Sequence, residues 1–325
     1  MSSAIPINDI IELLHANSKD VDEGLKQHLR ATLGKEFVES VADLRILTMA
    51  LDSLRFPSPV LVRFSESDIQ FVSINGLNCP VDRHDFSVSI PSAHQGVYEP
   101  HVVACLRKIC RPGSVAFDIG ANVGYHTMLM AHLAGSEGMC YAFEPNSENC
   151  RLILIGKEHN HISNLTLMPI ALSDEIGFAY FATSLGSNGA FVDQKYMAMH
   201  GHGTVVPTFT LDSLPLPKVD VMKIDVEGAE YKILKGAEKH LLNSRPSIIC
   251  EFSMAMTQRV SGVSAETFFN WMLGMEYNIY MLDRSHGEIV LMNSVGDFFN
   301  RWGDVYRIED FLFLPREKAH LIAAT

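Results

Sequence analysis

A short loop with two glycines follows an apolar run about a third of the way along the chain. Residues 117–125 read FDIGANVGY, a strand pattern that leads through the loop into a helical pattern. Gly120 and Gly124 allow a tight turn and let a ligand approach the backbone without a Cβ in the way. A dinucleotide-binding loop has a glycine where Asn122 stands, and the carboxylate of Asp118 would repel a pyrophosphate. Asp118 instead suits a ligand with an ammonium or sulfonium group.

A second acid ends the next apolar run. Glu144, in AFEPN, lies one strand–helix unit after Asp118, about where an acid reaches ribose hydroxyls. One acid that binds the ribose of a nucleoside and a second acid near an amino-acid part indicate S-adenosylmethionine as the cofactor. The structural alternative is that Asp118 caps a helix and Glu144 is a solvated loop acid.

Three more acids are candidates for catalysis. Asp225 and Glu227 follow one apolar run, and Glu251 ends the next. Neighbouring parallel strands lie about 4.8 Å apart, so Asp225 and Glu251 should meet at the carboxyl edge of a sheet. Clustered carboxylates raise one another's pKa, which improves a proton acceptor, or they ligate a hard cation such as Mg²⁺. Asp225 is the predicted centre, with Glu251 assisting, and metal dependence stays open.

Glu227 and His126 have structural alternatives as well. Glu227 opens a predicted helix over 228–242, where an acid favours the positive end of the helix dipole. His126 is a candidate base because imidazole titrates near neutral pH, although a packing histidine is commoner. A carboxylate cannot fully deprotonate an alcohol beforehand, so any carboxylate base accepts the proton as the oxygen attacks.

These residues require a sheet whose strand ends share one edge. Apolar runs predict strands over 115–118, 139–143, 165–170, 221–224, 248–251, 279–282 and 311–314. Helical patterns lie between the first five, apart from a β-like insertion at about 178–209. Strands alternating with helices imply right-handed crossovers and a mostly parallel α/β sheet, and the last two strands suggest an antiparallel finish.

The chain before this sheet has a different pattern. Residues 1–56 show helical periodicity that ends at the prolines of FPSP, and residues 60–90 show short β-type runs, the last of them FSVSI. We therefore expect a helical extension over 1–56, a β-rich segment over 57–96 and a catalytic domain over 97–325. The apolar stripe of the extension could form a dimer surface, so a homo-oligomer is one expectation.

Composition argues against several partners. Lys and Arg number 26 against 38 Asp and Glu, and the net charge of −12 gives no bulk attraction for nucleic acid or anionic lipid. No apolar run of about 18 residues predicts a transmembrane helix, and the first residues do not read as a signal peptide. The six cysteines form no CxxC pair, which argues against a structural zinc site. We expect a cytoplasmic protein with no nucleic-acid or membrane partner.

Several motifs in a fixed order resemble the FkbM-type methyltransferases. They are FDIGANVGYHT, AFEPNSENCRLI, ALSDEIG, LDSL, VMKIDVEGAEYKILKGAEKHLL and RPSIICEF. The resemblance covers residues 97–252 and, more loosely, the remaining C-terminus. It implies a class I methyltransferase fold, a Rossmann-like sheet of seven strands in the order 3-2-1-4-5-7-6 with strand 7 antiparallel. It also implies S-adenosylmethionine-dependent O-methylation of a hydroxyl on a sugar, a polyketide or a similar small molecule or glycan.

The resemblance also implies roles for individual residues. The methionine and ribose part of the cofactor would lie along Asp118, Gly120, Asn122 and Gly124, with Glu144 at the ribose hydroxyls, residues from Ala171 to Ser173 beside the adenine, and Glu99 where the family often has an acid. Glu99 has an alternative as an ordinary charge at a helix N-terminus. Two other functions remain open, a nicotinamide-dependent oxidoreductase and a non-catalytic interaction protein with the same fold.

Overall fold

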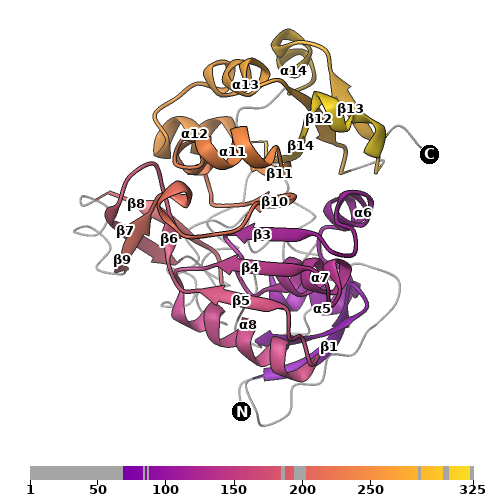
Figure 1. The fold of residues 1–325 in the computed structure, drawn as a ribbon. Helices are drawn as coiled ribbons and strands as arrows, with labels where there is room; N and C mark the ends of the chain where they lie inside the picture. Colours follow the sequence, from indigo (N-terminus) through magenta and orange to yellow (C-terminus); the bar gives the residue numbers. More distant parts are fainter. Residues whose placement is uncertain are drawn as a thin grey trace, which may run out of the picture.

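The computed structural model describes residues 69–82, 85, 88–183, 187–193, 203–284, 287–302 and 307–322. The predicted helical extension, residues 1–56, and the start of the predicted β-rich segment lie outside the described residues. The described part forms three sheets, the largest of which has eight strands (Figure 1). Within this part, no helix combines the length and the apolar character that crossing a bilayer requires.

The large sheet is mixed, with five parallel strands and an antiparallel end. Across the sheet its strands are β5 (Leu165–Met168), β4 (Met139–Phe143), β3 (Val115–Ile119), β10 (Val221–Ile224), β11 (Ser247–Phe252), β14 (Glu309–Pro315), β12 (Tyr277–Leu282) and β13 (Ile289–Met292). β14 runs antiparallel to β11 and β12, and β13 runs antiparallel to β12. Without β13, and with the other seven strands numbered along the chain, the order is 3-2-1-4-5-7-6. All seven predicted strands are present, and β13 is an additional strand that was not predicted.

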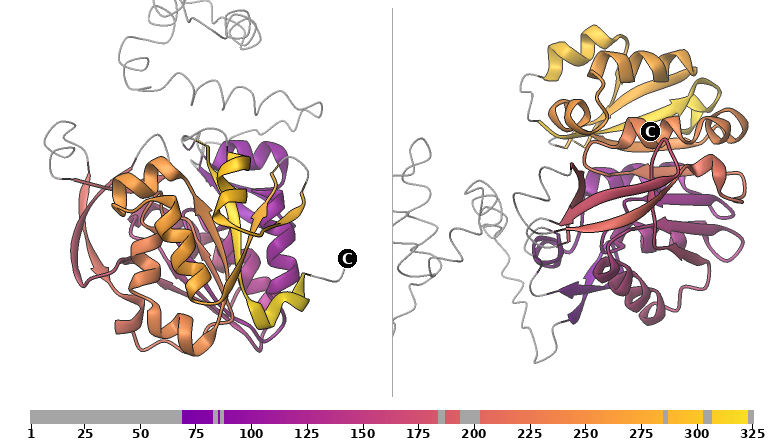
Figure 2. Two further views of the ribbon diagram at one scale, coloured as in Figure 1. Left: turned by 90° about the horizontal axis from the view of Figure 1, so that it is seen from above. Right: turned by 90° about the vertical axis from the view of Figure 1, so that its left-hand side faces the viewer.

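Helices cover both faces of this sheet (Figure 2). One face carries α6 (Pro100–Ile109), α7 (Tyr125–Ala134) and α8 (Ser147–His159), and the other carries α10 (Glu230–Lys235), α11 (Glu238–Ser244), α12 (Met254–Val260), α13 (Ala265–Gly274) and α14 (Val295–Trp302). Side chains alternate along a strand, so Phe117 packs under the second group of helices and Ala116 under the first. The same alternation places Asp118 and its register partner Lys223 on the face of α6 and α7.

A hairpin before the large sheet shares a core with two of its helices. β1 (Ile69–Ile74) and β2 (Leu77–Asp82) pair antiparallel around Asn75 and Gly76, both with positive φ (56° and 85°) as a two-residue hairpin turn requires. Ile74 and Val81 belong to the same apolar cluster as Met128 of α7. The hairpin is thereby anchored to the helix that follows the glycine loop.

The predicted strand FSVSI is wrong at its end, because Ser89 begins a helix. α5 spans Ser89–Gln95. The carboxylate of Asp85 accepts the backbone N–H groups of Val88 and Ser89 (3.2 and 3.0 Å), which are donors that the first turn of a helix leaves without an intrahelical partner. This capping by a preceding acid outweighs the local β pattern.

The helix predicted over 228–242 is interrupted at Gly236 and forms α10 and α11 instead. The backbone at Gly236 lies against the chain after β6 (Ala171–Leu172), and a Cβ there would stand 2.1 Å from the carbonyl oxygen of Ser173. The carboxylate of Asp212 then accepts the N–H groups of Lys239 and His240 in the first turn of α11 (2.8 and 3.1 Å). The close backbone contact at Gly236 and the capping by Asp212 therefore divide this segment into two helices, although its apolar periodicity is continuous.

The predicted β-like insertion forms a separate small sheet. Its strands β6, β9 (Thr204–Phe209), β7 (Gly177–Thr183) and β8 (Gly189–Val192) lie in that order. The arrows of β3, β4 and β5 point toward this sheet, so it stands at the carboxyl edge of the large sheet (Figure 1). Its apolar residues Ala171, Phe181 and Val206 form a small cluster of their own.

The close approach at Gly236 predicts a specific loss of stability. We expect Gly236→Ala to lower the free energy of unfolding by about 1–3 kcal/mol, because the added methyl group must displace a backbone carbonyl. The matched control is Gly274→Ala at the end of α13, where nothing lies within 4 Å of the added Cβ. Urea denaturation followed by circular dichroism compares the two, and equal midpoints would contradict the interpretation.

Candidate active site

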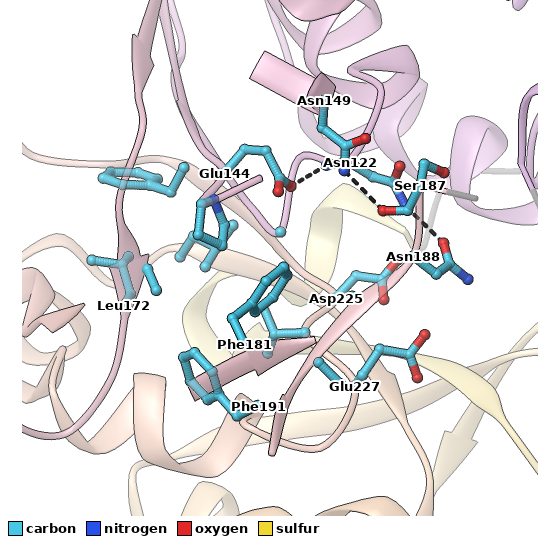
Figure 3. Close-up of a pocket in the computed structure, with 18 of the residues that line it drawn as sticks. Asn122, Glu144, Asn149, Leu172, Phe181, Ser187, Asn188, Phe191, Asp225 and Glu227 are labelled. Atoms are coloured by element: carbon cyan, nitrogen blue, oxygen red, sulfur yellow. Dashed lines mark hydrogen bonds between the residues drawn. The ribbon is translucent and has the colours of Figure 1, made fainter. Parts of the chain in front are cut away.

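A cavity of about 750 Å³, including the part open to solvent, lies between the β7–β8 hairpin and the carboxyl edge of the large sheet (Figure 3). One end of its wall is apolar, the glycine loop contributes polar groups, and carboxylates line the other end. The apolar end and the hairpin contribute Phe143, Pro145, Ile170, Leu172, Phe181 and Phe191. Leu172 and the acids Asp225 and Glu227 lie on opposite sides of the view in Figure 3.

The glycine loop is fixed between the ends of two strands. The N–H groups of Gly120 and Ala121 both donate to the carbonyl oxygen of Phe143 at the end of β4 (3.0 and 3.1 Å). Gly120 has a φ of +79°, and a Cβ there would stand 1.9 Å from the carbonyl oxygen of Asp225. Glycine is required here because the loop passes so close to the residue that follows β10.

Glu144 follows β4 and lines the cavity. Its carboxylate accepts the backbone N–H groups of Asn122 and Asn146, each at 2.8 Å. Burial raises the pKa of Glu144 to about 7, although these hydrogen bonds act in the opposite direction. A carboxylate offers about four acceptor positions, so Glu144 keeps capacity for the hydroxyl groups of a ligand.

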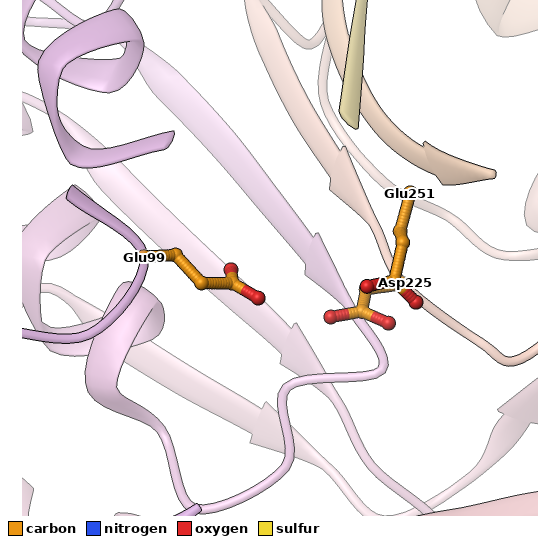
Figure 4. A group of neighbouring side chains, drawn as sticks. All are labelled: Glu99, Asp225 and Glu251. Carbon is orange, nitrogen blue, oxygen red and sulfur yellow. The ribbon is translucent and has the colours of Figure 1, made fainter. Parts of the chain in front are cut away.

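Three acids from distant parts of the chain meet beside this cavity (Figure 4). Glu99 precedes α6, Asp225 follows β10 and Glu251 lies on β11, and one ligand oxygen of each falls within 4.8 Å of the others. The predicted approach of Asp225 to Glu251 is thus observed. Asp225 and Glu251 line the cavity, whereas Glu99 does not.

Each of these three carboxylates has a basic partner. The pairs are Lys223 with Asp225 (2.9 Å), His126 with Glu99 (2.8 Å) and Arg284 with Glu251 (3.2 Å). Breaking such a buried pair leaves an uncompensated charge, which is strongly destabilising. The acids are therefore held in place by groups that lie mostly away from the cavity.

Burial and neighbouring charges separate the pKa values of these groups. Burial raises the pKa of Glu251 well above its ordinary value, and the negative charge of Asp225 raises it further. Burial also acts on Glu99, but the hydrogen bond from His126 and the charge of Lys223 outweigh it, so its pKa is lowered. Burial lowers the pKa of Lys223, yet the surrounding carboxylates more than reverse this effect. Glu99 and Lys223 therefore stay charged near neutral pH.

Glu227 projects from a tight loop between β10 and α10. Its backbone is left-handed (φ +53°), which is uncommon for a residue with a side chain. The buried carboxylate of Glu230 holds the loop by accepting the N–H groups of Val226 and Gly228 (3.3 and 3.0 Å). Burial, and then the charge of Asp225, raise the pKa of Glu227 to about 7. Glu227 lines the cavity, and its side chain has no hydrogen bond or ion pair within the described residues.

The β7–β8 hairpin is tied to the glycine loop and to α8. The side chain of Asn122 donates to that of Asn188 (2.8 Å), and the side chain of Asn149 donates to the carbonyl oxygen of Ser187 (2.9 Å; Figure 3). Two buried atoms in this wall, Asn122 Oδ1 and Ser187 Oγ, have no hydrogen-bond partner among the described residues. The sequence identified the insertion as a segment that could close over a substrate, and its residues 187–189 line the cavity.

Two predicted residues of the glycine loop region do not line the cavity. Asp118 was expected to share a cavity with Glu144, but it is buried on the α7 side of β3, where it accepts a hydrogen bond from Thr127 (2.5 Å). Strand alternation is the physical reason. Gly124 packs against α8, since a Cβ there would stand 2.7 Å from Ile153 Cγ1.

The other predicted residues lie in three places. Gly120, Asn122, Glu144 and Ala171 line the cavity together with the catalytic candidates Asp225, Glu227 and Glu251. Ser173 lines a neighbouring cavity and donates to Asp174 (2.9 Å). His126 is buried on α7 and reaches the acids only through its hydrogen bond with Glu99. His126 therefore supports the site rather than facing the cavity.

Three residues of the site were not predicted from the sequence, namely Lys223, Arg284 and Tyr98. A lysine in the apolar run VMKI was a usable signal, because a charge in a buried strand needs a partner. Arg284 follows β12 and bridges Glu251 and Asp310, which stand opposite each other on β11 and β14. Tyr98 lines the cavity. The sequence around Arg284 and Tyr98 does not indicate a role in the site, because the residues that they lie beside are remote in the chain.

Comparisons with known proteins agree with this geometry. The family model of the methyltransferase FkbM domain matches residues 118–294. The chain is 29% identical over 145 residues to the hexuronic acid methyltransferase AglP of Haloferax volcanii, which covers 42% of this chain and 56% of the relative. The chain thus spans about half the length of this curated relative.

Solved methyltransferase structures resemble the chain at low sequence identity. The FkbM methyltransferase of Methylobacillus flagellatus KT has a TM-score of 0.40 at 14% identity, with coverage of 65% of this chain and 51% of that one. The precorrin-6y C5,15-methyltransferase of Geobacter metallireducens GS-15 has a TM-score of 0.38 at 15% identity, with coverage of 67% and 88%. The family match extends over more than half of the sequence. The chain, an α/β protein with a class I methyltransferase fold, therefore belongs to the FkbM methyltransferase family.

Proposed function

We propose that this chain transfers a methyl group from S-adenosylmethionine to a hydroxyl of a sugar or a similar small molecule. The observation that carries the proposal is a single cavity with Glu144 and an apolar end on one side and a group of carboxylates on the other. Membership of a methyltransferase family supports the donor. The similarity to a hexuronic acid methyltransferase supports a sugar acceptor.

The cavity wall fits the parts of this cofactor. Phe143 and Leu172 would pack on the adenine, and Glu144 would accept hydrogen bonds from the ribose hydroxyls. Asn122 Oδ1 and Ser187 Oγ, both buried without a partner among the described residues, would meet the polar groups of the amino-acid part. When bound, S-adenosylmethionine supplies a methyl group on a positively charged sulfur.

The charge of the cavity favours this cofactor over a nicotinamide dinucleotide. Four acids line it, and among the described residues no lysine, arginine or histidine does. At pH 8, where Glu144 and Glu227 are mostly ionised, a pyrophosphate would face carboxylates with no basic side chain among the described lining residues, whereas a sulfonium and an ammonium group are attracted by them. The oxidoreductase alternative is disfavoured on this ground.

The position of Glu144 predicts a selective loss of cofactor affinity. We expect Glu144→Gln to weaken binding of the demethylated cofactor, S-adenosylhomocysteine, by at least about tenfold at pH 8. A carboxyl with a pKa of about 7 is mostly ionised there, and hydrogen bonds to a charged acceptor contribute roughly 1.5–3 kcal/mol. Isothermal titration measures this effect. Glu148→Gln on the exposed surface of α8 is the control and should bind as the unmodified protein does. Equal affinities for the two variants would refute the assignment.

Among the acids, Glu227 is the best placed to accept the proton. Asp225, the predicted centre, is held by Lys223, and Glu251 is held by Arg284. Glu227 faces the cavity with no hydrogen bond or salt bridge in the described part of the chain. The charge of Arg259 lowers its pKa, but burial and the charge of Asp225 outweigh this effect, and the resulting pKa of about 7 suits a base at neutral pH. Glu227 would thus accept the hydroxyl proton while Asp225 and Glu251 orient the acceptor.

This assignment predicts a change in turnover without a change in cofactor binding. We expect Glu227→Gln to lower kcat by about 10²–10⁴-fold, the usual contribution of a general base. S-adenosylhomocysteine binding should stay within about twofold. Glu266→Gln, at an exposed site on α13, is the control. Turnover is measured as S-adenosylhomocysteine release with glucuronic acid and neutral hexoses as acceptors.

The pH dependence of kcat tests the same residue. A base with a pKa of about 7 is mostly protonated at pH 6, so kcat should fall roughly tenfold from its plateau above pH 8 to its value at pH 6. An ordinary glutamate, with a pKa of about 4.3, would give a flat profile over this range. A flat profile, or full activity of Glu227→Gln, would assign the proton to another group.

The internal partners of the acids also bear on metal dependence. Lys223 and Arg284 already place positive charge beside the cluster, so we expect methyl transfer to proceed without a divalent cation. Turnover after dialysis against EDTA should stay within about twofold of the untreated rate, because alignment rather than a Lewis acid supplies the acceleration. A loss of activity that Mg²⁺ restores would instead make Glu99, Asp225 and Glu251 metal ligands.

A further inference from the structure

A second cavity adjoins the first beneath the small sheet. It measures about 940 Å³, including the part open to solvent, and lies between the β7–β8 hairpin and the helices α10 and α12. Phe191 of the hairpin lines both cavities. Ser173 lines the second cavity, two residues after Ala171 of the first. Phe191 is therefore a shared wall of the two cavities, and a molecule that occupies both must extend past its ring.

The wall of this cavity combines aromatic rings with charged groups of both signs. Phe178 and Phe191 contribute the rings, and Phe178 is 79% exposed, an unusual position for a large apolar side chain. The helices contribute Lys232 and Arg259. On the small-sheet side the wall includes the acid Glu175. Burying Phe178 against a ligand would remove apolar surface that now faces water.

This combination matches the chemistry of a sugar ring. A pyranose has a C–H face that packs on an aromatic ring, and hydroxyl groups at its edge that both donate and accept hydrogen bonds. Lys232 and Arg259 can only donate, whereas Glu175 can accept, so the cavity offers both functions. Lys232 also lies 3.7 Å from Asp174, but an apolar polyketide tail would offer no hydrogen-bonding group to Arg259 or Glu175.

We propose that the second cavity is a subsite that binds the neighbouring sugar unit of a saccharide acceptor while another unit is methylated in the first cavity. The proposal rests on the proposed function and names its substrate class, an acceptor of at least two sugar units. Phe178 provides the stacking surface, and Arg259, on the side of the subsite close to Glu227, contacts the hydroxyl or carboxylate groups of that unit.

Saccharide binding to the full chain, saturated with S-adenosylhomocysteine, tests this proposal. The probes are cellotetraose, a hyaluronan tetrasaccharide, glucose and glucuronic acid, and isothermal titration measures each dissociation constant. We expect at least one tetrasaccharide to bind, and Phe178→Ala to weaken its binding about fivefold, as the loss of one aromatic contact does. Binding of the monosaccharides should not change.

Two matched variants complete the experiment. Tyr180→Ala alters a partly exposed aromatic two residues along β7 that does not line the second cavity, and it should bind as the unmodified chain does. Arg259→Gln, on exposed helix surface, should weaken the acidic tetrasaccharide more than the neutral one. Equal binding by Phe178→Ala and Tyr180→Ala would overturn the subsite.

The outcomes separate this proposal from the proposed function. If the unmodified chain binds S-adenosylhomocysteine but none of the tetrasaccharides, the subsite is refuted and the methyl-donor site stands. If it does not bind S-adenosylhomocysteine, the proposed function itself fails. If Phe178→Ala weakens the tetrasaccharide and the monosaccharide equally, the residue serves the first cavity and the subsite is again refuted.

Discussion

The site depends on keeping several carboxylates together in a place with little water. Asp225, Glu251 and Glu99 would repel one another if nothing neutralised them, and burial makes each charge more costly. Lys223 is the main compensation, because its ammonium group is buried on the same sheet face and lies 2.9 Å from Asp225. Replacing that lysine with an apolar residue would leave charges that the fold cannot solvate. The acid-lined cavity therefore depends on a cation carried by a strand of the sheet core, together with Arg284 beside Glu251.

Charged residues of opposite and like sign also stand at paired positions on neighbouring strands of the sheet. Lys223 stands opposite Asp118 on the neighbouring strand, and Glu251 stands opposite Asp310. All four side chains lie on the face covered by α6 and α7, whose first residues follow Glu99 and Gly124. The charged layer thus sits between a sheet and two helix N-termini, where the helix dipoles favour negative charge. The catalytic candidates and the structural ion pairs therefore belong to the same charged layer on this face of the sheet.

Much of the large sheet was predictable from the sequence, and the reasons for success and failure are physical. Buried parallel strands are short apolar runs, so β3, β4 and β10 could be located from composition alone. The approach of the acids at the ends of neighbouring strands was predictable as well, because parallel strands share a carboxyl edge. Features that depend on tertiary contact could not be predicted, such as the interruption at Gly236 by the Ser173 carbonyl. The prediction for Asp118 failed for a different reason, because it considered the residue type and not the alternation of side chains along the strand.

One consequence follows from the hydrogen bond between Asn122 and Asn188. It joins the loop on the donor side of the cavity to the hairpin that borders the second cavity, so the two sides share a wall. A substitution in the hairpin that alters the choice of acceptor will also disturb the loop beneath it. Under the proposed function, a substitution that alters acceptor binding through this hairpin would therefore also alter donor affinity, and a compensating change in the glycine loop would be needed to restore it.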